Sequence, residues 1–455
     1  MSKPILYYST NLTANPVPFN EALLKGLAPD KGLFMPEIIP SFSHDEIKAL
    51  KNKAYYEVAF EVCRKFMSGI LSDDELLTMV KNAYDFPIPL EHVYENKYVI
   101  RLDQGPTASF KDFAGRMMGQ WMQFFLKKDN KKLLILTATS GDTGSAIANA
   151  FYGLENIKVV VLFPEKEVTP RQRKQMTTLG KNVKIIAIDT KFDDAQALVK
   201  EAFSDPDLNY LPLSSANSIN IGRLIPQIVY YFYSFAQLSK GTKDESVVFS
   251  VPSGNFGDMM GGVLAMKMGL PVKRFVISTN KNEEFPKYLA TGKYQKIEPS
   301  VNCISSAMNV GHPSNLARLV ALYGGVMDEQ GNISKAANME LMKKEIFSVS
   351  IDDQKTKDTI KDAWSNHKLL LEPHGSVGWA GLMNYLELHP EPKDQLCISL
   401  ETAHPAKFPE QINKIIGIDP ELPESLKGLE LKEEHFDLLK SNYADFKSYL
   451  IKNYN

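Results

Sequence analysis

The sequence predicts an α/β protein in which helices cover parallel β-sheets, with a mainly helical region at the N-terminus. Two observations lead to this prediction. Short, almost continuously apolar runs alternate with longer segments whose apolar residues recur at helical spacing, and turns rich in glycine and serine separate them. The run 158–163 shows the first pattern clearly, because nearly every residue in it is Val, Leu or Phe, as in a strand buried on both faces.

Beyond residue 95 the predicted elements follow one another in a regular order. Strands are expected at 98–103, 133–137, 158–163, 183–188, 246–251, 274–278 and 396–400. Helices are expected at 113–125, 145–152, 193–203, 224–238 and 259–268, with a charged helical tail at 429–455. We therefore divide the chain into a mainly helical region (1–95) and two α/β domains (96–240 and 241–455), whose ligands would bind at the carboxyl ends of the strands.

The composition is ordinary for a soluble globular protein and narrows the function classes. The chain has 455 residues, 44% hydrophobic and 23% charged, which predicts about two to three domains. A formal net charge of −2 gives no basic field for nucleic acid.

Cys63, Cys303 and Cys397 are far apart, so neither a disulfide framework nor a metal site is expected, and a reducing cytoplasm fits best. The N-terminus resembles no signal peptide, and no apolar stretch is long enough to span a membrane.

Lys111 is the residue with the most informative surroundings. It lies in Ser109-Phe110-Lys111-Asp112-Phe113, between a predicted strand and a predicted helix, and follows the turn Gly105-Pro106-Thr107. A packed helix fixes the lysine from behind while its amine stays open in front, which suits an amine that must form a Schiff base at a defined point. A lone lysine at such a place is usually solvated, so the hypothesis depends on the loops around it.

Two glycine-rich loops lie at the carboxyl ends of predicted strands. The first is Thr139-Ser140-Gly141-Asp142-Thr143-Gly144, and the second is Pro252-Ser253-Gly254-Asn255-Phe256-Gly257-Asp258. Both precede helices, whose N-terminal N–H groups attract anions, although each loop alone could be an ordinary capped turn. The second loop fits neither the nucleoside triphosphate nor the dinucleotide signature. A fixed lysine with two anion-binding loops is the combination that pyridoxal 5'-phosphate and an amino-acid substrate require.

A third cluster, Ser215-Ala216-Asn217-Ser218-Ile219-Asn220 followed by Arg223, precedes another apolar helix. Its amides, hydroxyls and guanidinium could hold a second phosphate. The alternative is a polar N-cap with Arg223 in a surface ion pair.

Taken in chain order, these motifs resemble those of the threonine synthase family. The further segments that carry the resemblance are Tyr8-Ser9-Thr10, Glu21-Ala22-Leu23-Leu24-Lys25-Gly26-Leu27-Ala28, Glu372-Pro373-His374-Gly375 and Thr402-Ala403-His404-Pro405-Ala406-Lys407-Phe408. The likeness spans nearly the whole chain, in the longer form of the family. It implies fold type II, which is two parallel-sheet domains like tryptophan synthase β with the cofactor between them. Two departures occur: Asn11 stands where the family usually has arginine, and Asn309 where aspartate is frequent.

The resemblance also implies an activity: O-phospho-L-homoserine and water become L-threonine and phosphate, the last step of threonine biosynthesis. Lys111 would join the cofactor and act as base and acid at Cα and Cβ. The other cofactor contacts implied are Gly254, Asn255, Phe256, Gly257 and Thr402. The substrate contacts implied are Ser140, Gly141, Asp142 and Thr143 for its carboxylate, and Asn217, Ser218 and Arg223 for its phosphate. His374 and His404 receive no catalytic role, and either a monomer or a homodimer is compatible with the sequence.

Two alternatives stay open at this point. A serine/threonine dehydratase or a cysteine synthase of the same fold needs no second phosphate site, so the cluster from Asn217 to Arg223 argues against it. A non-catalytic relative that only binds pyridoxal phosphate or a phosphorylated metabolite would not need Lys111, so the presence of this lysine argues against it.

Overall fold

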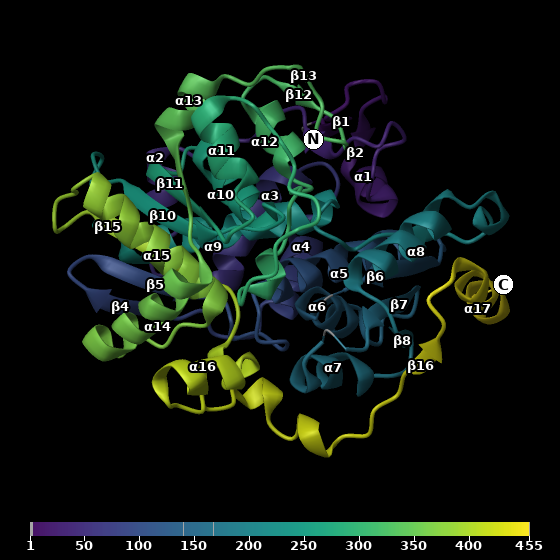
Figure 1. The fold of residues 1–455 in the computed structure, drawn as a ribbon. Helices are drawn as coiled ribbons and strands as arrows, with labels where there is room; N and C mark the ends of the chain where they lie inside the picture. Colours follow the sequence, from purple (N-terminus) through teal and green to yellow (C-terminus); the bar gives the residue numbers. More distant parts are fainter. Residues whose placement is uncertain (1–2, 140, 167, 455) are drawn as a thin grey trace.

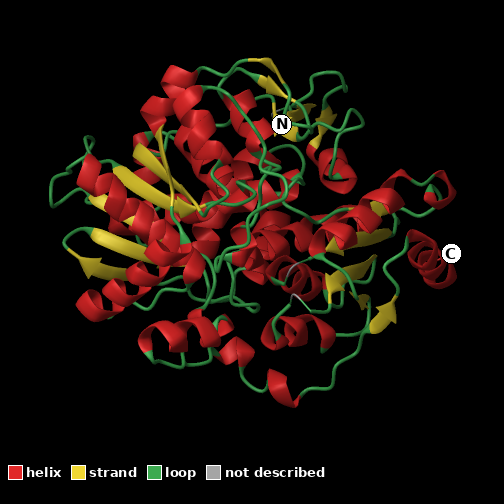
Figure 2. Cartoon of the chain, viewed as in Figure 1, coloured by secondary structure: helices red, strands yellow, loops and turns green. Residues whose placement is uncertain are grey.

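Two parallel sheets covered by helices organise the chain (Figures 1 and 2). The computed structural model describes residues 3–139, 141–166 and 168–454. The larger sheet has the strand order β14-β11-β10-β15-β5-β4, and only the edge pair β4–β5 is antiparallel. Its strands are β4 (Leu90–Tyr94), β5 (Lys97–Arg101), β10 (Val247–Pro252), β11 (Val272–Thr279), β14 (Ile346–Ser350) and β15 (Leu396–Glu401). The predicted α/β class is confirmed.

The smaller sheet has the order β16-β8-β7-β6-β9 and is parallel throughout. Its strands are β6 (Leu133–Ala138), β7 (Ile157–Pro164), β8 (Val183–Ile188), β9 (Leu213–Ser214) and β16 (Asp437–Leu439). The interior of β7 is buried on both faces apart from Lys158, as its Val/Leu/Phe run predicts.

The strands pair across the boundaries predicted at residues 95 and 240. β5, expected in the domain 96–240, pairs in parallel with β15, with Tyr98 opposite Ile398. At the other end of the chain, β16 returns to the smaller sheet and pairs with β8. The C-terminal segment, yellow in Figure 1, passes from α16 (Pro409–Ile416) below α7 (Pro170–Thr177), at the bottom of the view, to reach it. Each sheet is therefore completed by a segment distant from it in sequence.

The helices cover the sheets and fill the space between them (Figure 1). Those of the first 95 residues are α1 (Phe19–Lys25), α2 (His44–Lys48), α3 (Tyr55–Met67) and α4 (Asp73–Ala83). Those around the smaller sheet and the centre are α5 (Lys111–Lys128), α6 (Asp142–Phe151), α7 (Pro170–Thr177), α8 (Phe192–Ser204), α9 (Ile221–Leu238) and α10 (Gly257–Lys267). The later helices are α11 (Glu284–Thr291), α12 (Leu316–Leu322), α13 (Met339–Glu345), α14 (Asp353–His367), α15 (Pro373–Leu388), α16 (Pro409–Ile416) and α17 (Tyr443–Tyr454).

Two small antiparallel sheets complete the fold, and both lie near the N-terminus in Figure 1. One has the order β2-β1-β3, with β1 at Leu6–Ser9, β2 at Val17–Pro18 and β3 at Phe34–Pro36. The other pairs β12 (Val326–Met327) with β13 (Ile333–Lys335). No helix among the described residues combines the length and the apolarity needed to cross a membrane.

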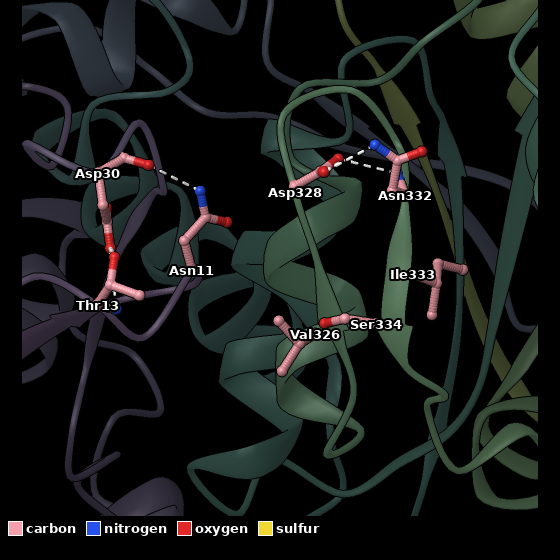
Figure 3. Close-up of a pocket in the computed structure, with 8 residues that line it drawn as sticks. All are labelled: Asn11, Thr13, Asp30, Val326, Asp328, Asn332, Ile333 and Ser334. Atoms are coloured by element: carbon pink, nitrogen blue, oxygen red, sulfur yellow. Dashed lines mark hydrogen bonds between the residues drawn. The ribbon is translucent and has the colours of Figure 1, made fainter.

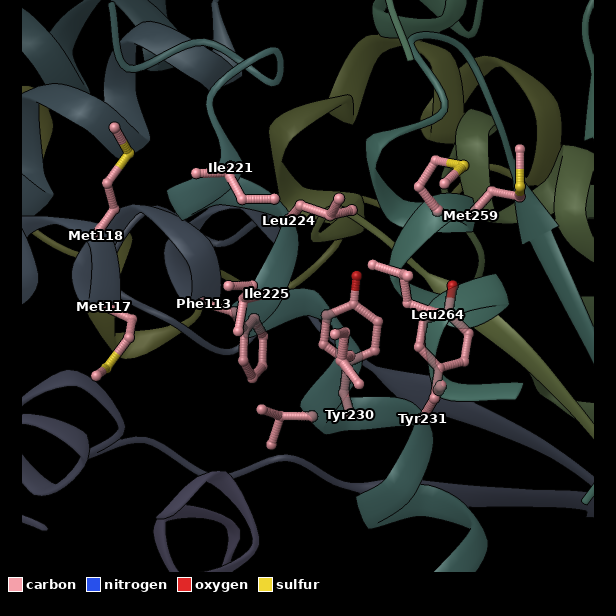
Figure 4. Close-up of a cluster of buried hydrophobic side chains, with 14 of the residues drawn as sticks. Phe113, Met117, Met118, Ile221, Leu224, Ile225, Tyr230, Tyr231, Met259 and Leu264 are labelled. Carbon is pink, nitrogen blue, oxygen red and sulfur yellow. The ribbon is translucent and has the colours of Figure 1, made fainter. Parts of the chain in front are cut away.

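Helix α9 forms the centre of the core and packs between α5 and α10 (Figure 4). It begins after Asn220, whose Oδ1 accepts the N–H of Gly222 at 2.9 Å and whose Nδ2 donates to the carbonyls of Leu23 and Ser215. Such a cap stabilises a helix start by about 1 kcal/mol. Tyr230 on α9 meets Phe113 on α5 edge to face at 5.6 Å. This contact fixes the first turn of α5, where Lys111 lies.

Candidate active site

Lys111 is the first residue of α5 and lies beside the carboxyl end of β15. The segment before it forms a short antiparallel bridge to the chain leaving that strand. The Phe110 N–H donates to the Thr402 carbonyl at 2.9 Å, and the His404 N–H donates to the Ala108 carbonyl at 3.0 Å. The lysine is therefore held by a helix on one side and by backbone hydrogen bonds on the other.

The turn before Lys111 is closed by the next residue, Asp112. Its carboxylate accepts the Thr107 hydroxyl at 2.6 Å and the Thr107 N–H at 2.8 Å. A Cβ on Gly105 would lie 2.4 Å from Asp112 Oδ2, so this turn accepts only glycine. The motif Gly105-Pro106-Thr107 thus fixes the backbone that carries the lysine.

The Lys111 amine is in an environment that disfavours its charge. Only 13% of the side chain is exposed, and Nζ lies 3.9 Å from Asp142 Oδ2. Burial lowers the pKa of Lys111; Asp142 and Glu372 oppose this change, and the cations Lys407 and Arg223 add to it. An amine with a lowered pKa is a better base and nucleophile near neutral pH than an exposed lysine.

The loop between β6 and α6 brings Asp142 to this amine. Gly141 has a φ of 136°, and a Cβ there would lie 2.7 Å from the Gln172 side chain, so glycine is needed. Its N–H donates to Thr139 Oγ1 at 2.9 Å and is not free for an anion. Thr143 is half-buried, and its hydroxyl contacts no protein partner in the described part of the chain. Ser140, predicted to act with them, lies outside the described residues.

The second glycine-rich loop lies between β10 and α10. Phe256 adopts the left-handed conformation with φ 63° immediately before α10, which aims successive N–H groups to one side. Among the described residues, none accepts a hydrogen bond from the N–H groups of Gly254 to Gly257. A Cβ on Gly254 would lie 2.9 Å from Met308 Cα, in the short helix η2 (Ser306–Met308). The loop is a narrow backbone cup of the kind predicted for a phosphate.

The Asn217 to Arg223 cluster lies next to this cup. A Cβ on Gly257 would be 3.5 Å from the Ser218 Cβ, which places the two loops in contact. Asn217 Oδ1 accepts the Thr137 hydroxyl at 2.7 Å. Arg223 is 3% exposed and donates to the Ala216 carbonyl at 2.8 Å, whereas its buried Nε has no partner among the described residues. Burial lowers the pKa of Arg223 to about 10. The predicted alternative, a surface ion pair, is wrong because this guanidinium is buried.

Thr402 follows β15 and neighbours the Lys111 segment through its backbone. It is 7% exposed, and its hydroxyl has no protein partner in the part of the chain that the structure describes. The structure thus brings Lys111, Thr402 and the three loops to one place, at the carboxyl ends of strands from both sheets.

Three residues in this region were not predicted from the sequence. Lys407 Nζ lies 2.6 Å from Asp142 Oδ1. Asp258 accepts hydrogen bonds from two tyrosines, and burial raises its pKa to about 6. Arg318 is fully buried and donates to the carbonyls of Ser218 and Ile219. Lys407 and Asp258 lie within motifs identified in the sequence, and these motifs were the signal that could have pointed to them. Arg318 lies in an apolar helix, α12, that carries no such motif.

The two motif histidines have structural partners. His374 Nε2 accepts the Ala307 N–H at 3.0 Å, so its proton is on Nδ1, which donates to Glu372 Oε2. It thereby holds η2 over the cup. His404 Nδ1 accepts the Ala406 N–H at 3.1 Å and caps the short helix η3 (Pro405–Lys407).

The two family departures lie outside the Lys111 cluster. Asn309 Oδ1 accepts the Asn280 amide at 3.0 Å and the Cys303 N–H at 3.1 Å. Asn11 lines a separate cavity of about 380 Å³ between the N-terminal region and the β12–β13 hairpin (Figure 3). The residues lining this cavity are Asn11, Thr13, Asp30, Val326, Asp328, Asn332, Ile333 and Ser334. It shares no residue with the Lys111 cluster.

Comparison with known proteins gives one consistent result. Residues 89–400 match the family described as pyridoxal-phosphate dependent enzyme, residues 6–84 match the threonine synthase N terminus, and residues 376–450 match the threonine synthase C-terminal family. The chain is 42% identical over 437 residues to the threonine synthase of Haemophilus influenzae, covering 96% of this chain and 97% of the relative. It is 39% identical over 411 residues to that of Escherichia coli, covering 90% and 91%. The crystal structure of pyridoxal-phosphate-bound threonine synthase from Brucella melitensis superposes with a TM-score of 0.91 at 34% identity, covering 98% of both chains.

Proposed function

The chain belongs to the threonine synthase family and is a pyridoxal-phosphate-dependent lyase, and on this premise we propose how its residues convert O-phospho-L-homoserine and water into L-threonine and phosphate. The observation that carries the assignment of roles is the Lys111 amine: it is largely buried, has a lowered pKa, and lies among the three loops described above. Among the described residues of the cluster, the other lysine is Lys407, and it is committed to Asp142.

The residues fit the cofactor. The N–H groups of Gly254 to Gly257 have no hydrogen-bond acceptor among the described residues. The cup lies so close to η2 that a Cβ on Gly254 would fill the space between them. When bound, pyridoxal 5'-phosphate supplies an aldehyde for a lysine amine and a ring that accepts the electrons left behind when a proton departs. Thr402 offers an unpaired hydroxyl for the pyridine nitrogen. A hydroxyl, unlike a carboxylate, does not hold that nitrogen protonated, which limits the electron sink.

Lys111 would move both protons of the reaction. Its free amine accepts the proton from Cα and, on the same face, the proton from Cβ whose departure accompanies loss of phosphate from Cγ. One swinging amine can reach both carbons because it is anchored at the start of a packed helix. The amine would carry one proton at a time: the two protons taken from Cα and Cβ would be returned to Cγ, which becomes the methyl group, and to Cα, while water supplies the hydroxyl at Cβ and the proton that the departing phosphate takes up.

The substrate would be held at both ends. We assign its carboxylate to the loop of Ser140, Gly141, Asp142 and Thr143, through the Thr143 hydroxyl and the N–H groups at the start of α6, since the Asp142 carboxylate itself is negative and is held by Lys407 and Gln172. We assign its phosphate to Asn217, Ser218 and Arg223; the buried Nε of Arg223 has no partner in the described part of the chain. A phosphate there would satisfy that group with a charge-assisted hydrogen bond.

The broader setting is also part of the proposal. Residues 96–240 would supply Lys111 and the substrate loops, and residues 241–455 the cofactor cup and Thr402. We propose a small-molecule substrate and no nucleic acid partner, a monomer or homodimer, and a cytoplasmic location. Free and buried Cys63, Cys303 and Cys397 support a reducing compartment.

The test is to measure phosphate release and threonine formation from O-phospho-L-homoserine, with and without added pyridoxal 5'-phosphate. We expect equal amounts of the two products. Lys111→Ala should abolish both and remove the absorbance band at about 410–420 nm of a lysine–pyridoxal adduct. Cofactor binding without phosphate release in the unaltered protein would refute the reaction.

Arg223→Ala separates this reaction from those of dehydratases. It should lower kcat/KM for phosphohomoserine by about 100-fold, the value of one charge-assisted contact of about 2–3 kcal/mol, while any slow reaction with L-serine or L-threonine is retained. Full activity of this variant on phosphohomoserine would remove Arg223 from the phosphate site.

A further inference from the structure

Lys407 is a second lysine buried beside Lys111, and it comes from a distant part of the chain. It is the last residue of η3, just after β15, and its side chain has no exposed surface. Its amine makes two contacts: Asp142 Oδ1 at 2.6 Å and the Thr107 carbonyl at 2.9 Å. A fully buried lysine is rare unless its charge is compensated.

Both partners of Lys407 belong to segments that carry the site. Asp142 begins α6 in the substrate loop, and Thr107 is held by Asp112, the residue after Lys111. The Thr107 carbonyl also accepts Gln175 Nε2 at 3.0 Å. Lys407 therefore ties the loop after β6 and the Lys111 segment to the strand end that supplies Thr402.

The two oxygens of Asp142 have different partners. Oδ1 accepts Lys407 at 2.6 Å and Gln172 at 2.9 Å, whereas Oδ2 is 3.9 Å from the Lys111 amine, beyond hydrogen-bond distance. The single negative charge is thus compensated by Lys407. When Lys111 releases its proton, a balanced pair remains, so the release is not opposed by a stranded carboxylate.

The other charged groups that act on Lys111 come from three further elements. They are Arg223 on α9, Glu372 at the start of α15 and Asp258 on α10. Asp258 is engaged by Tyr230 and Tyr231, and Glu372 accepts the ring N–H of His374. Among these groups, Asp142 is the carboxylate with an oxygen facing the lysine at ion-pair distance.

We propose that Lys407 is a positioning residue that makes the Lys111 amine easier to deprotonate by committing the Asp142 carboxylate to its own ammonium. Without Lys407, the Asp142 charge would turn to Lys111 and hold it as an ammonium, which is neither a base nor a nucleophile. This inference rests on the role of Lys111 given under the proposed function.

The test measures the protonation of Lys111 directly, without substrate or cofactor. The full-length cofactor-free protein is treated with a trace of acetic anhydride between pH 6 and 11, and acetylation of the Lys111 peptide is quantified by mass spectrometry against exposed Lys432. We expect the midpoint for Lys111 to lie below that for Lys432. In Lys407→Met the Lys111 midpoint should rise by about one pH unit or more, because this is the usual effect of an opposite charge at this distance. A rise of about one unit means a tenfold smaller fraction of free Lys111 amine at neutral pH.

Three further variants separate charge from structure. Lys414→Met removes an exposed lysine on the neighbouring α16 and should leave the Lys111 midpoint unchanged. Lys407→Arg keeps the charge and should restore part of the low midpoint. Adding Asp142→Asn to Lys407→Met removes the uncompensated carboxylate and should return the midpoint to the original value; it also keeps the inference testable if the single variant folds poorly.

In the holoenzyme, the acidic limb of the kcat profile, which reports the enzyme–substrate complex in which the Lys111 amine has left the cofactor, should move to higher pH in Lys407→Met. An unchanged Lys111 midpoint in Lys407→Met, or one that Asp142→Asn fails to restore, would overturn the inference. The outcome is separable from the reaction itself, because labelling reports the amine even if phosphohomoserine proved not to be the substrate.

Discussion

Lys111 and Lys407 carry the same side chain in the same buried region, yet the structure gives them different relations to the same carboxylate. The difference is distance to one carboxylate: 2.6 Å for Lys407, which makes a hydrogen-bonded ion pair, and 3.9 Å for Lys111, which does not. At the scale of single residues, the proposed chemistry depends on which of the two amines forms the hydrogen-bonded ion pair with Asp142.

Asp258 is a second residue whose ionisation is governed by burial. Its Oδ1 accepts the Tyr230 and Tyr231 hydroxyls at 2.5 and 2.8 Å, and its buried Oδ2 has no partner in the described residues. Burial raises its pKa to about 6, above the usual value of about 3.9 in an unfolded chain. The folded state therefore favours the protonated form of Asp258. The contribution of this group to the free energy of unfolding is complete below pH 4 and is lost as the pH rises through 6.

Asp258→Asn should remove this pH dependence. Relative to the unaltered protein, the free energy of unfolding of the variant should improve by about 2–3 kcal/mol between pH 4 and pH 7, measured by urea unfolding of the cofactor-free protein. Tyr231→Phe removes a hydrogen bond that lowers the pKa of Asp258, so in this variant the loss of stability should occur at higher pH. A difference between Asp258→Asn and the unaltered protein that stays constant with pH would show that Asp258 is ionised throughout.

Sequence patterns identify residues whose proposed role depends on the residues next to them in the chain. Lys111 was identifiable because the turn before it and the helix after it are adjacent in the chain. Lys407 was not, because its significance arises only when β15 brings it to Asp142. Arg318 was hidden for the same reason, since its partners Phe34 and Ile219 are far from it in sequence.

At the scale of elements, the cofactor cup depends on a helix start and on the segment that covers it. The strand β10 delivers the loop, Phe256 turns it, and α10 orients its N–H groups. The helix η2 lies against Gly254 and is held there by His374, whose Nε2 accepts the Ala307 N–H. The cup is thus narrow because two elements approach it without a side chain between them.

Gly254→Ala should weaken cofactor binding for this reason. The new Cβ would lie 2.9 Å from Met308 Cα and 3.1 Å from the Ala307 carbonyl, so η2 must move. We expect the dissociation constant for pyridoxal 5'-phosphate to rise by about 10–100-fold, from an overpacking cost of about 1–3 kcal/mol. Titration of the cofactor-free protein by absorbance measures it.

Gly257→Ala is the matched control in the same loop. There the nearest atom would be the Ser218 Cβ at 3.5 Å, an ordinary contact. Its effect on the dissociation constant should be clearly smaller than that of Gly254→Ala. Equal effects would mean that the loop backbone, and not its contact with η2, determines binding.

Most elements with a strong local pattern were predicted within a few residues. The strand 183–188 has the predicted bounds, and the helix expected at 193–203 spans Phe192–Ser204. Nine of the described strands were not predicted: β1 to β4, β9, β12 to β14 and β16. They are short or half exposed, so neither a continuous apolar run nor a clear alternation marks them. The helical tail expected at 429–455 was wrong in its first half, because β16 lies there and the helix α17 begins only at Tyr443.

At the scale of the whole molecule, the presence of parallel sheets was predictable from the sequence, but which strands pair within each sheet was not. Local patterns specify strands, whereas pairing between β5 and β15, or between β16 and β8, is decided by contacts between distant segments. The consequence is functional: the β5–β15 pair places Lys111 next to Thr402, and the C-terminal segment ties the smaller sheet to the rest of the protein.

The last helix, α17, should therefore stabilise the half of the molecule that presents Asp142. Phe446 and Leu450 are buried against α8 and the smaller sheet, in a cluster with Leu198, Val199 and Ala202. Lys447 adds ion pairs at 2.8 Å to Asp205 and 2.7 Å to Asp207. These contacts join the end of the chain to a helix formed from residues in its middle.

Leu450→Ala should lower the free energy of unfolding by about 2–5 kcal/mol, because it leaves a cavity in a fully buried cluster. The control is Lys452→Ala, an exposed position on the same helix, where a change within about 0.5 kcal/mol is expected. Urea unfolding and the rate of limited proteolysis within 133–214 measure both variants. If α17 supports the smaller sheet, Leu450→Ala alone should make residues 133–214 more accessible to protease and lose activity at a lower temperature. If the two variants unfold alike, α17 does not stabilise the smaller sheet.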